Sequence, residues 1–476
     1  MPMPTIDPFS SILSLGQRIR SGELNAELLT GFYLDRIARL DHKLGAFVEV
    51  LSDRALMKAR RADLELAAGI DRGVLHGIPY AVKDLYDVSG VPTRAGTHIL
   101  DANVPDSDAF VVDRLDHLGA VLIGKTHTVQ FAYGGVGINS QLGTPMNPWS
   151  ETHHIPGGSS SGSGVAVGAG MIPMALGSDT GGSVRIPAAF NSVTGLKTTV
   201  GQISRRGVFP LSWTLDTVGP LTRDVSDARA IYPLMAVRDD GDPSMTAFQS
   251  VRENTKHLSD MRLAYVDTIF LEGCDPEVEA LVKMTRPVFE KIVGRIEQAS
   301  FDVAKQAVEL NPKGLVIAAE AYYSNRNLID QHFEKLDPVV AHRLIKGRDV
   351  TASEYIDIQN GLNRVRVESL EFFDRFDAVI VPSVMIPPSP LSSCEESIQS
   401  YATINVQCLR NTAIGNMLNL SAVTVPCGFT KKGLPVGLMI YGKPFDEMKI
   451  LEIANAFQSN TDWHLNRPDL SWCESK

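Results

Sequence analysis

Two glycines directly precede a serine in the run SDTGGSVRIP at residues 178–187. Backbone N–H groups that glycine leaves free can converge on one point. In acyl transfer, that point is where the carbonyl oxygen gains negative charge, and oriented donors there stabilise the tetrahedral intermediate. We therefore take Ser183 as a candidate nucleophile, and Thr180, Gly181 and Gly182 as a candidate oxyanion hole.

A serine hydroxyl is a weak nucleophile until a base removes its proton, and no local motif places a histidine or aspartate to act on Ser183. Lys83 is a different candidate base, because it ends the apolar run IPYAVK at residues 78–83. This run predicts a strand that carries the amine into the interior. Burial disfavours the ammonium form, so we expect it to lower the pKa of Lys83 towards neutral pH.

The run GGSSSGSG at residues 157–164 is too flexible and too polar for the interior of a regular helix or strand. It leads directly into the apolar segment 165–176, which must be buried, so it is not a free linker. Its small residues indicate closely approaching backbones. This Gly/Ser loop, which contains Ser159 and Ser160, is therefore a further candidate part of the site.

These stretches together resemble the amidase signature family. The similarity is continuous over residues 157–187, including the interval between Ser159 and Ser183, and it extends to GIP at 77–79 and VKD at 82–84. It covers most of the chain apart from about residues 238–375. Further similar segments are 119–126, 195–198 and 433–437.

The resemblance implies a Ser–cisSer–Lys triad that cleaves amides without a metal or an organic cofactor. Lys83 accepts a proton through Ser159, whose preceding peptide bond is cis, and Ser183 forms the acyl-enzyme. Ammonia or an amine leaves first, and water then hydrolyses the ester. The positions that the resemblance assigns to bracing the loops and supporting the relay are Ser160, Asp179 and Arg185.

The chain departs from the family pattern between residues 125 and 133. Asn and an acidic residue are frequent in the family where this sequence has His127 and Gln130. The stretch usually approaches the substrate, so we expect His127, Gln130 and Tyr133 to line the substrate pocket. Because selectivity depends on this stretch, no relative's substrate is transferred to this chain.

The pattern of elements predicts an α/β fold. Helical spacing over residues 11–66 is followed by alternating strands and helices over 73–124, and strand character returns from residue 378. The resemblance implies the amidase signature fold, with a central mixed β-sheet covered by helices on both faces. We expect a single domain over residues 1–476, and its expected parts are a signature core at about 70–225, a helical substrate-side segment at about 238–375, and strands and helices at 376–476 that rejoin the core.

Three other interpretations of these motifs fail on spacing or context. The run GAVLIGKT at residues 119–126 satisfies the P-loop pattern, but its continuous apolar stretch predicts a buried strand rather than a phosphate cradle. The run at 162–168 has one residue too many for a dinucleotide fingerprint. His127, His153 and His154 belong to no metal-ligand motif, so no metal site is expected.

Composition limits the partners. The net charge of −10 and the absence of a Lys/Arg cluster argue against nucleic acid, and no apolar run is long enough for a membrane span. The five cysteines are odd in number and widely spaced, and the stretch 1–13 has no charged start typical of a secretory signal. We therefore expect a cytoplasmic protein that binds a small-molecule amide and forms a homodimer or a higher homo-oligomer.

The function that follows is hydrolysis of a small organic amide, extending to carbamates or ureides. Two other classes remain open. One is the A-type subunit of a tRNA-dependent amidotransferase, which shares these motifs but passes ammonia to a partner. The other is a catalytically silent binding homologue, against which the intact Lys83, Ser159 and Ser183 argue.

Overall fold

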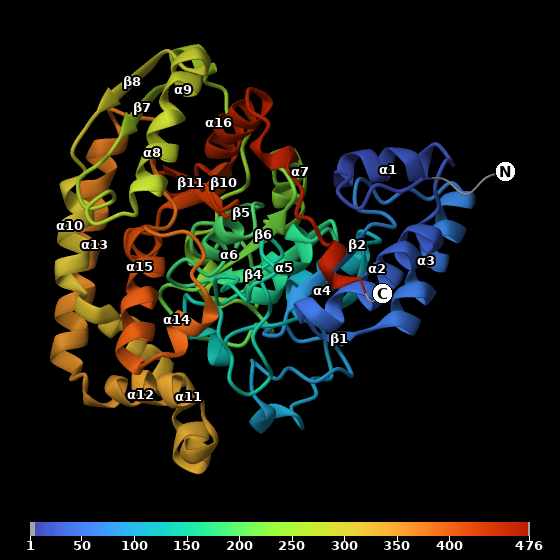
Figure 1. Ribbon diagram of the computed structural model, residues 1–476, viewed down its shortest axis with the longest axis horizontal. Helices are drawn as coiled ribbons and strands as arrows, with labels where there is room; N and C mark the ends of the chain where they lie inside the picture. The colour runs from blue at the N-terminus through green and yellow to red at the C-terminus, as the bar shows by residue number, and fades with distance from the viewer. Residues whose placement is uncertain (1–4, 475–476) are drawn as a thin grey trace.

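A mixed sheet of eleven strands runs through the computed structural model, which describes residues 5–474 (Figure 1). Its strand order is β1-β3-β2-β4-β6-β5-β10-β11-β9-β7-β8. Strand β2 pairs in parallel with β3 and β4, and β7 pairs in parallel with β8 and β9, whereas the other neighbours are antiparallel. The expected mixed α/β architecture is confirmed. The strands are β1 (Phe47–Val50), β2 (Pro79–Lys83), β3 (Val121–Thr126), β4 (Met174–Asp179), β5 (Thr194–Lys197), β6 (Thr217–Thr222), β7 (Arg262–Tyr265), β8 (Arg295–Gln298), β9 (Ala378–Pro382), β10 (Ser421–Phe429) and β11 (Pro435–Gly442).

Helices flank the sheet along its whole length (Figure 1). At one end lie the N-terminal helices, drawn in blue; at the other end α10, α13 and α15 lie side by side. Helix α2 begins where the Asn25 side chain accepts a hydrogen bond from the Leu28 N–H, and it ends at Gly45, whose φ of 60° stops the helix. The helices are α1 (Ile12–Arg20), α2 (Ala26–Leu44), α3 (Ser52–Ala67), α4 (Phe110–His117), α5 (Ser161–Gly168), α6 (Arg185–Phe190), α7 (Val225–Met235), α8 (Pro276–Met284), α9 (Arg286–Ile292), α10 (Asp302–Leu310), α11 (Leu315–His332), α12 (Pro338–Lys346), α13 (Ala352–Phe373), α14 (Leu391–Glu395), α15 (Ile398–Met417) and α16 (Glu447–Ser459).

The segment 238–375 holds α8 to α13, but it also supplies β7 and the edge strand β8, which the sequence did not predict. Both strands are only four residues long, and β8 is only partly buried. A short, half-exposed strand carries little hydrophobic alternation, so its charged residues favour a helical interpretation.

The prediction that residues 157–164 are too flexible for a helix is wrong in its second half, because α5 begins at Ser161. The glycines of α5 allow neighbouring residues to pack closely against the helix. A Cβ at Gly162 would lie 2.1 Å from the Ala46 carbonyl oxygen, and one at Gly164 would lie 2.8 Å from Pro187 Cβ. Tertiary packing therefore overrides the poor helix propensity of glycine here.

The parallel pairing of β2 with β4 positions the candidate site. Because parallel strands end at the same edge of a sheet, Lys83 at the end of β2 lies beside Ser178 and Asp179 at the end of β4. Ser183 follows in the loop between β4 and α6. Residues 1–4, part of the stretch considered as a signal, lie outside the described residues. Within residues 5–474, no helix combines the length and apolar character that a membrane crossing needs.

Candidate active site

Lys83 lies wholly inside the protein, with 0 % of its surface exposed. Its Nζ lies 2.7 Å from Ser159 Oγ and 2.9 Å from Ser178 Oγ, so its two observed hydrogen-bond partners are hydroxyls. Burial lowers the pKa of Lys83 to about 7, although the negative charges of Asp216 and Asp179 oppose this shift. A large fraction of the amine is therefore neutral near pH 7 and can accept a proton.

Ser159 is held by the backbone around it. The Gly158–Ser159 peptide bond is cis, as the resemblance implied. The Gly158 N–H donates to the Gly135 carbonyl at 2.8 Å, and the Ser159 carbonyl accepts from the Val129 N–H at 3.3 Å. These contacts fix the fully buried Ser159 hydroxyl against Lys83.

Ser183 and the Gly/Ser loop meet through Ser160. The Ser160 N–H donates to the Ser183 carbonyl at 3.2 Å, and Ser160 Oγ donates to the Ser178 carbonyl at 3.3 Å. The Ser183 side chain has no hydrogen bond within residues 5–474, and Ser183 is 4 % exposed. The two loops are therefore joined, and the Ser183 hydroxyl is free to rotate towards a reacting carbon or a base.

Asp179 and Arg185 form a buried ion pair on either side of Ser183, with Arg185 Nη2 at 2.9 Å from Asp179 Oδ1. The Asp179 carboxylate also accepts from the N–H groups of Gly182 at 2.9 Å and Val184 at 3.1 Å. Burial alone would raise the pKa of Asp179, but the charge and hydrogen bonds of Arg185 outweigh it and hold that pKa well below its ordinary value. The carboxylate therefore stays charged and holds the turn around Ser183.

The loop that contains the candidate oxyanion hole is only partly open. The Gly182 N–H is committed to Asp179, whereas no acceptor is seen among the described residues for the N–H groups of Thr180 and Gly181. The φ of Gly182 is 132°, and a Cβ there would lie 2.1 Å from Thr412 Oγ1, so only glycine fits. The structure thus leaves two of the three expected donors free.

Helix α15 supplies contacts to this loop that the sequence did not predict. Thr412 Oγ1 donates to the Gly181 carbonyl at 2.6 Å, and Asn416 Nδ2 donates to Asp179 Oδ1 at 2.8 Å. Asn416 Oδ1 in turn accepts from Arg185 Nη2 at 2.7 Å. No local motif marks these residues, and only the tertiary fold brings them to the site.

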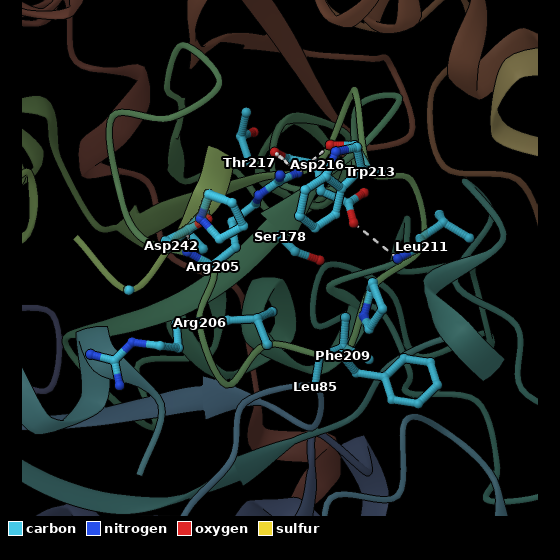
Figure 2. A pocket seen from close by; sticks show the side chains of 15 residues that line it. Leu85, Ser178, Arg205, Arg206, Phe209, Leu211, Trp213, Asp216, Thr217 and Asp242 are labelled. Atoms are coloured by element: carbon cyan, nitrogen blue, oxygen red, sulfur yellow. Dashed lines mark hydrogen bonds between the residues drawn. The ribbon is translucent and has the colours of Figure 1, made fainter. Parts of the chain in front are cut away.

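A cavity of about 250 Å³ opens beside Ser178 (Figure 2). Its walls are mostly apolar, with Arg205, Arg206, Asp216 and Asp242 among them. Ser178 joins this cavity to Lys83, whereas neither Ser159 nor Ser183 lines it. The other lining residues are Leu85, Val208, Phe209, Pro210, Leu211, Trp213, Thr217, Val218, Gly241 and Pro243.

The three residues expected in the substrate pocket are buried but do not line this cavity. His127 Nε2 lies 3.0 Å from the Leu142 carbonyl, and burial lowers the pKa of His127. Gln130 Oε1 accepts from the Asp337 N–H at 2.9 Å. The Tyr133 carbonyl accepts from Arg343 Nη1 at 2.6 Å, and the guanidinium lies 4.0 Å from the centre of the Tyr133 ring. Gln130 and Tyr133 thus join the site region to α12.

The P-loop-like run has a structural role. Residues Val121–Thr126 form β3, and Lys125 Nζ pairs with Asp84 Oδ1 at 2.7 Å with both side chains buried. The lysine that would bind a phosphate is thus already neutralised. Among residues 5–474, no group of three or more His, Cys, Asp or Glu side chains is arranged to hold a metal ion.

Comparison with known proteins gives consistent matches over the chain. The family model Amidase matches residues 28–451. A 2-amino-5-chloromuconic acid deaminase of Comamonas testosteroni is 35 % identical, covering 93 % of this chain and 94 % of its own. The A-type subunit of the glutamyl-tRNA(Gln) amidotransferase of Chromohalobacter salexigens is 33 % identical, covering 96 % of this chain and 98 % of its own. A solved amidase structure is 28 % identical with a TM-score of 0.84, covering 94 % of this chain and 99 % of that one. The chain belongs to the amidase family.

Proposed function

We propose that this protein hydrolyses the C–N bond of a small organic amide through a seryl acyl-enzyme. Ser183 is the nucleophile, Ser159 the relay and Lys83 the base. The observation that carries the proposal is the buried Lys83 amine, with a pKa of about 7, at 2.7 Å from Ser159 Oγ. A neutral amine in hydrogen-bond contact with a hydroxyl is the arrangement that general base catalysis requires.

In the proposed first half-reaction, Ser183 Oγ attacks the amide carbonyl carbon. Its proton passes to Ser159 Oγ as the Ser159 proton passes to Lys83 Nζ. The carbonyl oxygen becomes negative and is stabilised by the free N–H groups of Thr180 and Gly181. Proton return from Lys83 through Ser159 to the nitrogen lets ammonia or an amine leave.

The second half-reaction uses the same groups. Water attacks the ester carbon and gives its proton to the relay and Lys83; the proton then returns to Ser183 Oγ as the acid leaves. In this scheme Gly182 shapes the turn instead of donating to the substrate, because Asp179 already accepts its N–H. Asp179 and Arg185 act by holding the backbone on both sides of Ser183.

A small substrate is supported by the deaminase relative, whose name specifies a small organic acid. We include carbamates and ureides, because their carbonyl carbons are open to the same attack. The test is a panel of aryl and aliphatic amides, carbamates and ureides incubated with the purified chain, with release of ammonia or amine measured. Ser183→Ala is the control and is expected to lower turnover by about four orders of magnitude or more.

The A-type subunit of a tRNA-dependent amidotransferase is a second candidate, because several relatives of similar identity carry that name. Such a protein would depend on companion subunits and ATP for its full reaction. Turnover of small amides by the purified chain without ATP supports the hydrolase. Ammonia transfer that requires companion subunits, tRNA and ATP supports this second candidate and contradicts the first proposal.

Labelling with a fluorophosphonate separates both candidates from a catalytically silent homologue. An activated serine reacts covalently, so we expect one label per chain, lost in Ser183→Ala and strongly slowed in Lys83→Ala. A wild-type chain that takes no label and turns over no amide, alone or in a complex, would be a binding protein.

A further inference from the structure

The loop of residues 211–216 forms part of the cavity wall and also contacts the loop before Ser183. Asp216 makes both connections. Its Oδ2 accepts from the N–H groups of Leu211 at 2.9 Å and Ser212 at 3.0 Å, which closes the loop on itself. Its Oδ1 accepts from Thr180 Oγ1 at 2.5 Å. The position of this loop therefore determines where the Thr180 side chain lies.

Glu320 of α11 holds the same loop from the opposite side. Its Oε2 accepts from the Thr214 N–H at 3.0 Å and from Ser212 Oγ, and its Oε1 accepts from Thr214 Oγ1 at 2.8 Å. The Tyr355 hydroxyl of α13 donates the fourth hydrogen bond to this carboxylate, to Oε1 at 2.6 Å. Gln359, one turn further along α13, donates to Thr214 Oγ1 at 3.3 Å.

All four donors to the Glu320 carboxylate are neutral. Glu320 is 8 % exposed, and within the described residues no lysine, arginine or histidine forms an ion pair with it. A charge removed from water in this way is retained only when its hydrogen bonds are satisfied, and bonds to a carboxylate are roughly twice as strong as neutral ones. The loop is therefore firmly attached to α11 and α13.

We propose that Glu320 is a positioning residue for the active site. It fixes the loop 211–216 and, through Asp216, the Thr180 side chain next to the proposed oxyanion donors. This inference rests on the proposed function, in which Thr180 belongs to the oxyanion hole. It also gives the segment 238–375 a role, because α11 and α13 of this segment hold the loop that contacts Thr180.

The same attachment shapes the cavity. Leu211, Trp213 and Asp216 all line it, and Trp213 is 57 % exposed with the Arg205 guanidinium 5.3 Å from its ring centre (Figure 2). Arg205 Nη1 also donates to the Trp213 carbonyl at 2.9 Å. Release of the loop from Glu320 would therefore alter the cavity wall together with Thr180.

The test compares Glu320→Gln with the wild type by hydrogen–deuterium exchange. The new amide group cannot accept hydrogen bonds at its nitrogen, so one half of the attachment is lost. We expect faster exchange in peptides that cover 211–217 and also in those that cover 180–184, because local opening reports the stability of each segment. Glu309→Gln on α10 is the matched control, since its side chain is 64 % exposed; it should change neither.

Kinetics give a second readout. We expect Glu320→Gln to lower kcat roughly tenfold with little change in KM, as misplacement of transition-state groups does. Introduced into Thr180→Val, which lacks the Asp216 contact, Glu320→Gln should have little further effect, because coupled residues are not additive. Should Glu320→Gln fail to fold, Tyr355→Phe and Ser212→Ala each remove one donor and should give the same pattern at smaller size.

Faster exchange at 211–217 without any change at 180–184, or additive losses in the double variant, would overturn the inference. Exchange needs no substrate, so it decides the matter even for a chain without amidase activity. An inactive wild type whose 180–184 segment still loosens in Glu320→Gln would instead contradict only the proposed function.

Discussion

Arg185 binds the carboxylate of Asp179 through both Nε and Nη2, at 3.0 and 2.9 Å, and neither side chain is exposed to solvent. The two residues lie six positions apart with Ser183 between them, so their contact closes the backbone around the proposed nucleophile. Taking two charges out of water is costly, and such a pair is stable here because Asn416 and the N–H groups of the turn satisfy the remaining bonds.

Removing one partner of this pair should destabilise the fold strongly. We expect Arg185→Met to lower the free energy of unfolding by about 3–5 kcal/mol, because Asp179 is left as an unpaired buried charge. Urea denaturation measures the change. In contrast, Arg238→Met removes an exposed ion pair with Asp240 and should cost less than about 1 kcal/mol. Equal effects of the two substitutions would show that the buried pair is not needed for stability.

Activity should rise with pH through neutrality. The base form of Lys83 is the neutral amine, and its pKa is lowered to about 7, so protonation below that pH removes the base. We expect kcat/KM to fall about tenfold for each pH unit below 7 and to level off above it, as measured on a neutral amide. An activity that falls as pH rises through 7 would exclude Lys83 as the base.

Lys83→Met should abolish catalysis while favouring the folded state at low pH. The folded-state pKa of Lys83 lies below its ordinary value. Below pH 7 the buried ammonium therefore lowers the free energy of unfolding of the wild type, and this destabilisation disappears as pH rises above 7. Relative to the wild type, the variant's free energy of unfolding should therefore be higher at pH 6 than at pH 10, by an amount on the order of 4 kcal/mol. Denaturation of both proteins at the two pH values tests this; a difference of opposite sign would mean that the lysine is not desolvated.

Gly182→Ala should inactivate the enzyme without unfolding it. The new methyl group would lie 2.1 Å from Thr412 Oγ1, at a φ of 132° that alanine disfavours, so the turn before Ser183 must shift. We expect a loss of about two orders of magnitude in kcat, because a displacement near 1 Å has effects of that size. Gly31→Ala is the control, since a Cβ there meets nothing within 4 Å. Wild-type rates in Gly182→Ala would show that the turn is tolerant.

The sequence allowed Lys83, Ser159 and Ser183 to be named because a long motif with fixed spacing contains two of them, and the strand before Lys83 is a plain apolar run. Strands β2, β3, β9, β10 and β11 were likewise predicted, because each contains a plain apolar run. Asn416, Thr412 and Glu320 were not, because each acts across more than 100 residues of chain and belongs to no local pattern. The roles of His127, Gln130 and Tyr133, the cytoplasmic location and the homo-oligomeric state stay predictions.

Helix α5 shows why local reasoning failed in one place. Four Gly and Ser residues at 161–164 favour a loop by propensity, yet they form the first turn of a helix, and at Gly162 and Gly164 the neighbouring residues leave no room for a side chain. Propensity is a weak guide when packing determines the conformation.

The contacts of α15 with the turn before Ser183 also constrain when the enzyme can become active during translation. Asn416 and Thr412 lie 237 and 231 residues beyond their partners Asp179 and Gly181. A nascent chain therefore contains Ser183, the proposed nucleophile, long before the ribosome has added the helix that holds the turn around it. We therefore expect a chain that ends before α15 to lack an ordered turn around Ser183 and to show no amidase activity.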